Sequence, residues 1–438
     1  FHKFHLYVLM AIAPFQTAQD DTTSSEIVAP SAIEVIAGGS HSLALLDTGE
    51  LFAWGANSYG QVGNGSNVDV SFPVKVFDSV VMVSAGLQHT VAVKKTGECF
   101  VWGQNRFGQL GNGTNIDQYS PVHILEEDFE EGLYVVSASA GAEHSMAICR
   151  KNGLGPPELW VWGSNVCPGS GQQTLNPTLV LHDVLACAAG GYHCIALLQD
   201  KTLMSWGRNQ HGQLGDGSFN KRLQPVRVLA LSGVRNVGAG LDFSLALLEN
   251  GELYAWGHNR SGCLGDGTTV QRIKPVKILD GVRSITAGHD YSFALLENGV
   301  LYGWGNNRSG VLGDYILGTQ LSPAKILDDV IQVAAGGRHS MVVLKSGKCF
   351  IMGTNSNGQF GNRTLSTTQI GVHELCDLYY ISSLLAQNRG EPIKEERAVP
   401  ANDEQSRGIL RIGAEYRDDG LLLHTAQVFQ TELNKDGS

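Results

Sequence analysis

Five histidines recur at matching positions along the chain, and the imidazole nitrogen is a common zinc ligand. These residues are His41, His89, His144, His193 and His339. Two further copies of the surrounding sequence place Phe243 and Tyr291 in the same slot. In these two copies an aromatic ring, which does not bind zinc, therefore takes the place of the imidazole while the surrounding sequence keeps its pattern. We predict that these histidines pack in the interior and make a local hydrogen bond, and that the chain has no metal site.

Glycine-rich segments such as 108–113 resemble the loops that cradle phosphate groups. A loop of the Walker type is followed by Lys-Ser or Lys-Thr, and neither pair follows at that spacing here. Tight turns that use the conformational freedom of glycine explain these segments better. No set of Ser, His and Asp stands out as catalytic. The sequence therefore predicts a protein that is not an enzyme, with no catalytic residues and no cofactor.

The cysteines indicate little cross-linking. Cys187 and Cys194 flank one turn symmetrically, which predicts that they face each other at a separation compatible with a disulfide. Cys99 and Cys349 occupy equivalent positions in distant copies and are not expected to pair. Because the 8 cysteines have no regular spacing, we predict that most of them are free and buried.

Five asparagines have the sequence required for N-linked glycosylation, and all lie in glycine-rich segments: Asn64, Asn112, Asn259, Asn307 and Asn362. We expect these side chains to take part in the turns themselves, so the motif alone does not imply a glycan.

A repeat organises all of these residues. The dipeptide Ala-Gly opens a copy at seven places, namely Ala37, Ala85, Ala140, Ala189, Ala239, Ala287 and Ala335. Each copy continues through a pair such as Trp54-Gly55 to an Asn two residues further on, and then to a glycine-rich segment. A fixed period near fifty residues is typical of a propeller or a solenoid array.

The content of one copy favours the propeller. In the fifth copy, 243–257 reads as two short strands joined at Glu249-Asn250-Gly251, a typical hairpin turn. A short strand precedes the Ala-Gly pair, and a fourth strand opens at Pro275. Four antiparallel strands per copy make a propeller blade, so we predict an all-β, seven-bladed propeller. We also expect the segment 370–375 to pair with 33–36, so that the N- and C-terminal strands close the ring in one blade.

The repeated frame resembles the regulator of chromosome condensation repeat, as in YGQVGNG from Tyr59, FGQLGNG from Phe107 and HGQLGDG from His211. The resemblance covers 33–375 and implies a seven-bladed propeller that binds other proteins. Some members of that family catalyse nucleotide exchange on a small GTPase. The third copy here is short and irregular at 164–171, where exchange factors of the family carry a protruding wedge. Extra tryptophans that a plant photoreceptor of this fold needs in the Ala-Gly turns are absent here.

The flanking segments differ from the repeats. Residues 1–19 resemble a secretory signal peptide, 20–32 read as a linker, 33–376 as the propeller and 377–438 as a polar, mostly disordered tail. The apolar run 6–13 is too short to span a bilayer. These features predict a secreted protein, the alternative being a cytoplasmic or nuclear one. The net charge of −11 has no basic cluster within it, which argues against nucleic-acid binding.

One position varies while its neighbours barely change, namely the second residue between Ala-Gly and the turn histidine. We call this set the turn ring: Ser40, Gln88, Glu143, Tyr192, Asp242, Asp290 and Arg338. A turn that served folding alone would be expected to settle on one residue, although drift at a surface also produces variety. We therefore predict that the turn ring binds a protein partner. Its three carboxylates, against a single basic residue, predict a basic patch on that partner.

The functional prediction is a non-enzymatic, monomeric propeller that binds a protein through the face carrying the turn ring. The alternative is a guanine-nucleotide exchange factor for a small GTPase, which would need a protruding loop. The only sizeable extra loops are 126–133 and 151–158, both in the third copy.

Overall fold

A computed structural model describes residues 33–125, 132–164, 173–313 and 318–375, together with two short strands in the C-terminal segment. Within these residues the chain is all-β and contains no helix that could cross a membrane. The predicted signal peptide, the linker and nearly all of the predicted tail lie outside the described residues. The chain divides into two compact units, 1–389 and 390–438. The second unit contains the two-residue strands β29 (Glu415–Tyr416) and β30 (Leu422–Leu423), which pair with each other.

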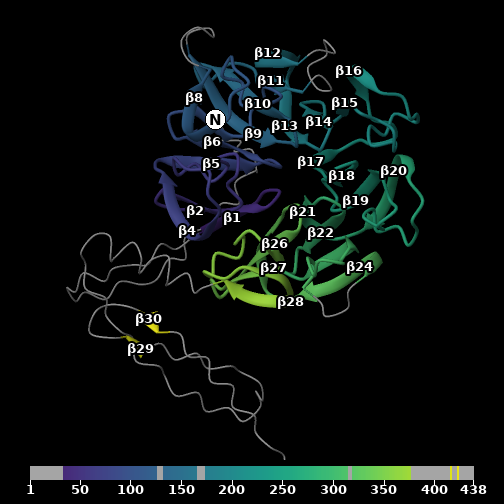
Figure 1. Ribbon diagram of the computed structural model, residues 1–438. Helices are drawn as coiled ribbons and strands as arrows, with labels where there is room; N and C mark the ends of the chain where they lie inside the picture. The colour runs from purple at the N-terminus through teal and green to yellow at the C-terminus, as the bar shows by residue number, and fades with distance from the viewer. Residues whose placement is uncertain are drawn as a thin grey trace, which may run out of the picture. The chain divides into compact units, whose positions relative to one another are not determined.

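Seven four-stranded antiparallel sheets follow one another around a central axis, so the predicted propeller and its blade number are confirmed (Figure 1). Each sheet is built from four consecutive strands. The innermost strand of each blade ends at the Ala-Gly pair. These inner strands are β1 (Ile33–Ala37), β5 (Val80–Ala85), β9 (Leu133–Ala140), β13 (Val184–Ala189), β17 (Val234–Ala239), β21 (Val282–Ala287) and β25 (Val330–Ala335).

The second strand of each blade begins at the histidine slot and is almost fully buried. These strands are β2 (His41–Leu46), β6 (His89–Lys94), β10 (His144–Lys151), β14 (His193–Leu198), β18 (Phe243–Leu248), β22 (Tyr291–Leu296) and β26 (His339–Leu344). The third strands carry the Trp-Gly pair or its Met-Gly counterpart. They are β3 (Leu51–Gly55), β7 (Cys99–Gly103), β11 (Glu158–Gly163), β15 (Leu203–Gly207), β19 (Leu253–Gly257), β23 (Leu301–Asn306) and β27 (Cys349–Asn355).

The outer strands begin before the proline that was predicted to open them. They are β4 (Val70–Phe77), β8 (Gln118–Ile124), β12 (Thr174–His182), β16 (Arg222–Arg227), β20 (Arg272–Leu279), β24 (Thr319–Leu327) and β28 (Ser366–Leu375). In the first blade, for example, Gly55 pairs with Val70 while Ala53 already pairs with Val74, so the ladder shifts between them. This irregularity accommodates Pro73, which has no backbone N–H to donate.

Buried tryptophans tie blades one to six to the blade before them, and Met352 occupies this position in blade seven. Trp102 is fully buried, and its indole Nε1 donates to the carbonyl of Gln61 in the preceding glycine-rich loop at 2.9 Å. Trp256 donates in the same way to the Gln213 carbonyl at 2.8 Å. The indole therefore fills the space between two sheets and satisfies its polar atom there, which explains why this residue type recurs.

The turn histidines also join neighbouring blades. His41 Nε2 lies 3.1 Å from Thr90 Oγ1 of the next blade. Three other turn histidines bond a serine of the next blade in the same way: His89–Ser145, His193–Ser244 and His339–Ser42. The Thr90 hydroxyl itself donates to the Gln61 carbonyl, so the imidazole must supply the hydrogen from Nε2. These side chains are completely buried. For four of the five histidines the prediction of packing with a hydrogen bond is confirmed, although the partner lies in the adjacent blade and not within the turn.

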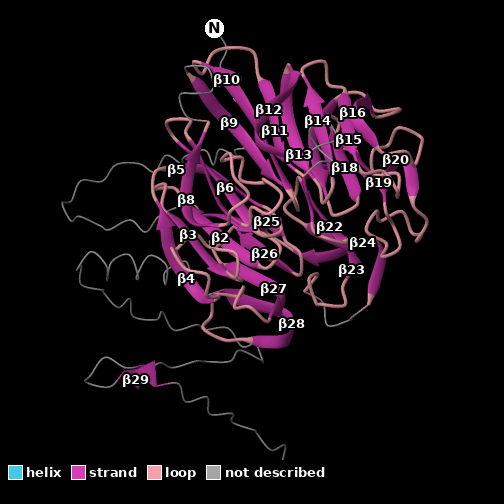
Figure 2. Cartoon of the chain, turned by 45° about the horizontal axis from the view of Figure 1, so that its top comes forward, coloured by secondary structure: helices cyan, strands magenta, loops and turns pink. Residues whose placement is uncertain are grey.

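The predicted closure by strand exchange is wrong. The C-terminal strand β28 pairs with β27 in the seventh blade, while β1 pairs with β2 in the first, so the two ends of the propeller never share a sheet. Figure 2 shows β28 beside β27. A pattern of strands without their pairing register does not show which strands share a sheet. A complete set of four strands is already present in both terminal blades.

Closure uses the same contacts as the other boundaries between blades. Trp54 Nε1 and Ser42 Oγ both donate to the carbonyl of Gln359, at 2.8 and 2.9 Å. The Gln332 amide also bonds both the N–H and the carbonyl of Val35, each at 3.2 Å. Side-chain and backbone hydrogen bonds between blades seven and one thus replace the expected strand pairing.

The predicted Cys187–Cys194 pairing is also wrong. The hairpin register places Cys194 opposite Ala189 and Cys187 opposite Ala196, so the two thiols are two positions out of step. Both cysteines are free, as are Cys99, Cys149, Cys263 and Cys349. For the cysteines that the structure describes, the prediction of free and mostly buried thiols is confirmed.

One boundary between blades departs from the histidine pattern and yields a prediction. His144 is fully buried and neither ring nitrogen has a hydrogen-bond partner, because the next blade carries Cys194 where other blades carry Ser or Thr. We expect Cys194→Ser to supply the hydroxyl that His144 lacks and to stabilise the protein by about 1 kcal/mol, measured by denaturant unfolding. Cys149→Ser is the matched control. That cysteine is buried among apolar side chains, so its replacement should destabilise the fold. A loss of stability in Cys194→Ser would contradict the expected hydrogen bond.

Candidate functional site

The Ala-Gly turns gather around the axis of the propeller on one face. All seven line a shallow central hollow of about 90 Å³, together with the side chains of Leu87, Leu241 and His289. Successive turns are linked by backbone hydrogen bonds, such as Gly39 N–H to the Gly86 carbonyl at 3.1 Å and Gly337 N–H to the Gly38 carbonyl at 3.0 Å. The hollow is therefore walled by backbone groups that already have partners. The variable side chains stand around it.

A second circle of variable residues adjoins the turn ring. In every blade the residue that follows Trp-Gly or Met-Gly donates its backbone N–H to the carbonyl of the turn-ring residue, at 2.8 or 2.9 Å. We call these residues the outer ring: Ala56, Gln104, Ser164, Arg208, His258, Asn306 and Thr354. The two rings are thus held in fixed register by seven equivalent bonds. The Ala-Gly turns and the start of the glycine-rich loops therefore share one face.

Tyr192 is the aromatic centre of one sector of this face. The guanidinium of Arg208 from the outer ring lies over its ring, 3.9 Å from the centroid. Partial burial, followed by the neighbouring carboxylate of Glu143, raises the pKa of Tyr192. The phenol is therefore un-ionised near neutral pH. Stacking under Arg208 also holds its ring in place.

The carboxylates of Asp242 and Asp290 occupy the next two turns. Gln213 Nε2 from the preceding blade donates to Asp242 Oδ1 at 2.9 Å, which fixes that carboxylate. The carboxylate of Asp290 has no hydrogen-bond or ion-pair partner among the described residues. Burial lowers the pKa of His258 although both carboxylates act in the opposite direction. His258 is therefore mainly neutral near pH 7, and the sector keeps its negative charge.

The other members of the turn ring are more isolated. Arg338 is exposed. Burial lowers the pKa of His289, and the nearby positive charge of Arg338 acts in the same direction. Ser40 and Gln88 are half-buried and make no side-chain hydrogen bond within the described residues. The structure therefore brings together Glu143, Tyr192, Asp242 and Asp290 from consecutive blades, which we call the acidic sector. It leaves the rest of the predicted ring as separate positions.

The sequence prediction missed the outer ring. Arg208 stacks on Tyr192, and His258 lies close enough to Asp242 and Asp290 for their charges to affect its pKa. Their signal was available, because the position after Trp-Gly varies as widely as the turn ring itself. Among the described residues no group of His, Cys, Asp and Glu has the arrangement of a metal site.

The fold and the face define the class of this protein, a seven-bladed propeller whose variable residues are displayed on turns around the axis. Models of the regulator of chromosome condensation (RCC1) repeat match the chain, one of them at 48–93, 96–148, 202–247, 250–295 and 298–343 and a second at six segments between 33 and 359. The chain therefore belongs to the RCC1 repeat family, as its resemblance to that repeat predicted.

Relatives within the family have diverse functions. The chain is 31% identical over 226 residues to the ultraviolet-B receptor UVR8 of Arabidopsis thaliana, a match covering 49% of this chain and 39% of that protein. It is 30% identical over 221 residues to the human E3 ubiquitin-protein ligase HERC2, covering 48% of this chain but only 4% of that protein. Both matches span well under two thirds of the relatives' own length, so neither identifies a whole-protein activity.

Solved structures share the fold. Prp20p of Saccharomyces cerevisiae, whose binding to Gsp1p and histones has been described, aligns with a TM-score of 0.62 and 25% identity, covering 75% of this chain and 84% of that one. Human WBSCR16 aligns with a TM-score of 0.65 at 21% identity, covering 75% and 94%. The second likeness is informative for the fold alone.

Proposed function

We propose that this chain is a non-enzymatic, monomeric propeller that binds a protein partner through the face formed by the turn ring and the outer ring. The single observation that carries the proposal is the acidic sector. Three carboxylates and a stacked tyrosine come from four consecutive blades, on a rigid scaffold that needs none of these side chains to close. Variable side chains on a fixed frame are typical of recognition surfaces.

The charge of the sector favours a partner with a basic patch. Glu143, Asp242 and Asp290 contribute three carboxylates to the sector, and the nearby guanidinium of Arg208 is already stacked on Tyr192. Complementary charge mainly accelerates association, whereas a central aromatic side chain more often governs the lifetime of a complex. The two kinds of residue should therefore affect different rate constants. Histones are basic proteins, so their described binding to the relative Prp20p supports this kind of partner.

A kinetic experiment tests the proposal once affinity purification and mass spectrometry provide a partner. We expect Asp242→Asn combined with Asp290→Asn to slow association by about 2- to 10-fold at low salt and to flatten its salt dependence. Tyr192→Ala should accelerate dissociation by about 5- to 30-fold, the equivalent of 1 to 2 kcal/mol. Melting temperatures should change little, because all three residues lie in surface turns.

The opposite face provides the control. Asp47 and Glu249 are exposed in hairpin turns between the second and third strands, away from the Ala-Gly turns. Asp47→Asn and Glu249→Gln should leave both rate constants unchanged. If the ring variants bind normally and these controls do not, the partner docks on the hairpin face and the proposal is wrong.

Nucleotide exchange on a small GTPase is the second candidate function. It is favoured by the likeness to Prp20p, at 25% identity, for which binding to Gsp1p has been described. Of the two extra loops in the third blade, 126–131 lies outside the described residues. The second forms a short turn after β10, where Arg150 Nη1 donates to the Gly155 carbonyl at 2.9 Å. The two functions are distinguished by measuring the release of labelled nucleotide from a panel of small GTPases. If this protein clearly accelerates that release, it is an exchange factor and not only a binding protein.

A further inference from the structure

The five potential glycosylation asparagines differ in how the fold uses their side chains. Asn259 is completely buried, and its Nδ2 donates to Asp266 Oδ1 at 2.9 Å and to the carbonyls of Thr268 and Val270 at 3.0 and 3.1 Å. Asn307 occupies the same slot in the next blade and is only 2% exposed. Both side chains hold a glycine-rich loop together from inside. A sugar on Asn259 would have to displace those bonds, and a sugar on Asn307 would have to fit at a side chain that is almost completely buried.

The remaining three sit seven residues later in the loop and use only their oxygen. Asn64 Oδ1 accepts from Asn57 Nδ2 at 3.1 Å, and from the backbone N–H and hydroxyl of Ser66 at 3.2 and 3.0 Å. Asn112 makes the same three bonds with Asn105 and Thr114. Asn362 makes them with Asn355 and Thr364. In none of the three does Nδ2 donate to a described residue, so the amide nitrogen is not needed by the loop.

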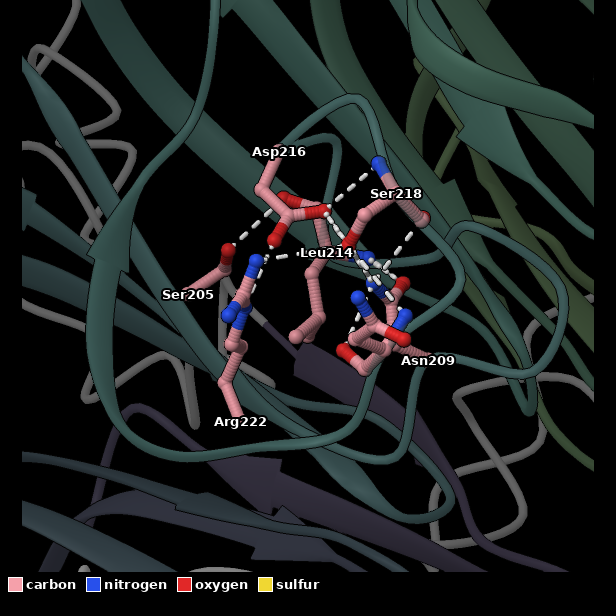
Figure 3. Close-up of polar contacts among 7 residues, drawn as sticks. Ser205, Asn209, Leu214, Asp216, Ser218 and Arg222 are labelled. Carbon is pink, nitrogen blue, oxygen red and sulfur yellow. Dashed lines mark hydrogen bonds and ion pairs between the residues drawn. The ribbon is translucent and has the colours of Figure 1, made fainter.

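Aspartate at the same position in blades four and five supports this division. Asp216 and Asp266 accept the equivalent bonds. Asp216 is also paired with Arg222 at 2.8 Å (Figure 3), and Asp266 with Arg272 at 2.7 Å. These arginines cover the carboxylates, whose side chains are only 6% and 8% exposed. A loop that works equally well with Asp requires an acceptor oxygen and no NH₂ group.

The covering arginine is absent where asparagine is present. Val70 and Gln118 stand at the arginine position in blades one and two. Asn64 is accordingly exposed, and Asn112 is partly exposed. The hydroxyl of Ser66 or Thr114 lies against the side chain of its asparagine, which is the residue pair that the glycosylation motif requires. Solvent therefore reaches an amide nitrogen with no other duty.

We propose that Asn64, Asn112 and Asn362 are acceptors for N-linked glycans, and that Asn259 and Asn307 are excluded in the folded protein. The donor class is a lipid pyrophosphate-linked oligosaccharide of the secretory pathway. The Asn Nδ2 forms a bond to the sugar C1 and loses one proton, while the C1–oxygen bond breaks and the lipid pyrophosphate leaves. The retained Oδ1 keeps its three loop hydrogen bonds. The proposal rests on the further proposal that this chain enters the secretory pathway, which its N-terminal sequence favours.

The test directs the full chain into the secretory pathway of cultured human cells with a heterologous signal sequence. Secreted, folded protein is treated with a glycosidase that converts each glycosylated Asn to Asp, and peptides are then analysed by mass spectrometry. We expect conversion at the three proposed asparagines and none at Asn259 or Asn307. Ser66→Ala and Thr114→Ala should abolish conversion at Asn64 and Asn112 respectively. Lack of conversion at all three, or conversion at Asn259 in the folded fraction, would overturn the proposal.

A matched pair of variants tests the role of the covering arginine. Asp266→Asn creates a new glycosylation motif with Gly267 and Thr268 while Arg272 remains. Combining Asp266→Asn with Arg272→Gln reproduces the arrangement of Asn112 and Gln118 in blade two. We expect the double variant to be glycosylated to a greater extent in the folded fraction than the single one. Equal occupancy would show that exposure at this position does not decide the modification, even if the double variant folds poorly.

Discussion

Lowering the pH from about 7 to about 5 is expected to reduce the free energy of unfolding of the propeller steeply, because its buried histidines must remain neutral. Burial, together with neighbouring imidazoles, lowers the pKa of His41, His89 and His193 to about 3, and burial lowers that of His339 to about 4. Each Nε2 already donates to a neighbouring hydroxyl, and the Nδ1 atoms are buried without partners. Protonation would place a charge where nothing solvates it.

The sign and size follow from the proton balance. An unfolded histidine has a pKa of about 6.5, so below that pH the unfolded chain binds protons that the folded chain refuses. The stabilisation is thus complete above about pH 6.5 and is lost towards pH 3 to 4. Each group contributes about 1.4 kcal/mol per pH unit. Glu34 acts in the opposite direction, since burial raises its pKa to about 7. The effect of the four histidines, reduced by the opposite effect of Glu34, is a loss of at most about 4 kcal/mol of unfolding free energy per pH unit between pH 6 and 5.

Chemical denaturation at several pH values measures this slope. His41→Phe should reduce the slope of unfolding free energy against pH by the contribution of one histidine. Phe is an acceptable substitute because Phe243 natively fills the equivalent buried position. His182→Gln is the matched control, since that imidazole is 64% exposed and does not share the buried environment of the turn histidines. If the unfolding free energy is the same at pH 7 and pH 5, the histidines are not held neutral.

Much of this fold could be predicted because its signals are local. The period, the Glu-Asn-Gly turn at 249–251 and the Trp-Gly pairs each reflect the chemistry of a few adjacent residues. Hairpin turns and buried indoles have similar requirements in every blade, so seven repetitions reinforced one interpretation. Replacement of His by Phe243 also indicated correctly that the slot is structural.

The features that could not be predicted depend on which atoms meet across the ring. The hydroxyl that bonds a turn histidine comes from the adjacent blade, for instance Ser244 for His193 and Ser42 for His339. The stacking of Arg208 on Tyr192 depends on the alignment of two rings of residues, which the repeat pattern does not encode. The cysteine prediction failed for a related reason, because the hairpin register is set by the turn and not by symmetry in sequence.

The manner of closure leads to the second large effect, an expected loss of stability in Gly337→Ala. An added Cβ at Gly337 would lie 2.5 Å from the carbonyl oxygen of Gly39, across the boundary between blades seven and one. Backbone on both sides is already tied by the bond from Gly337 N–H to the Gly38 carbonyl. Since neither partner is the flexible end of a side chain, the blades must move apart. We expect a cost of about 1 to 3 kcal/mol, as for overpacking in a tight core.

Two matched variants decide whether the closing boundary resembles the others. Gly191→Ala meets the Leu241 carbonyl oxygen at the same 2.5 Å across the boundary of blades four and five. Gly238→Ala meets nothing nearer than 3.7 Å and should be neutral or mildly stabilising. If hydrogen-bonded turns close the ring just as they join internal blades, Gly337→Ala and Gly191→Ala should lower the unfolding free energy by similar amounts. Tolerance of Gly337→Ala alone would mean that blades seven and one are held more loosely, or by other contacts, in solution.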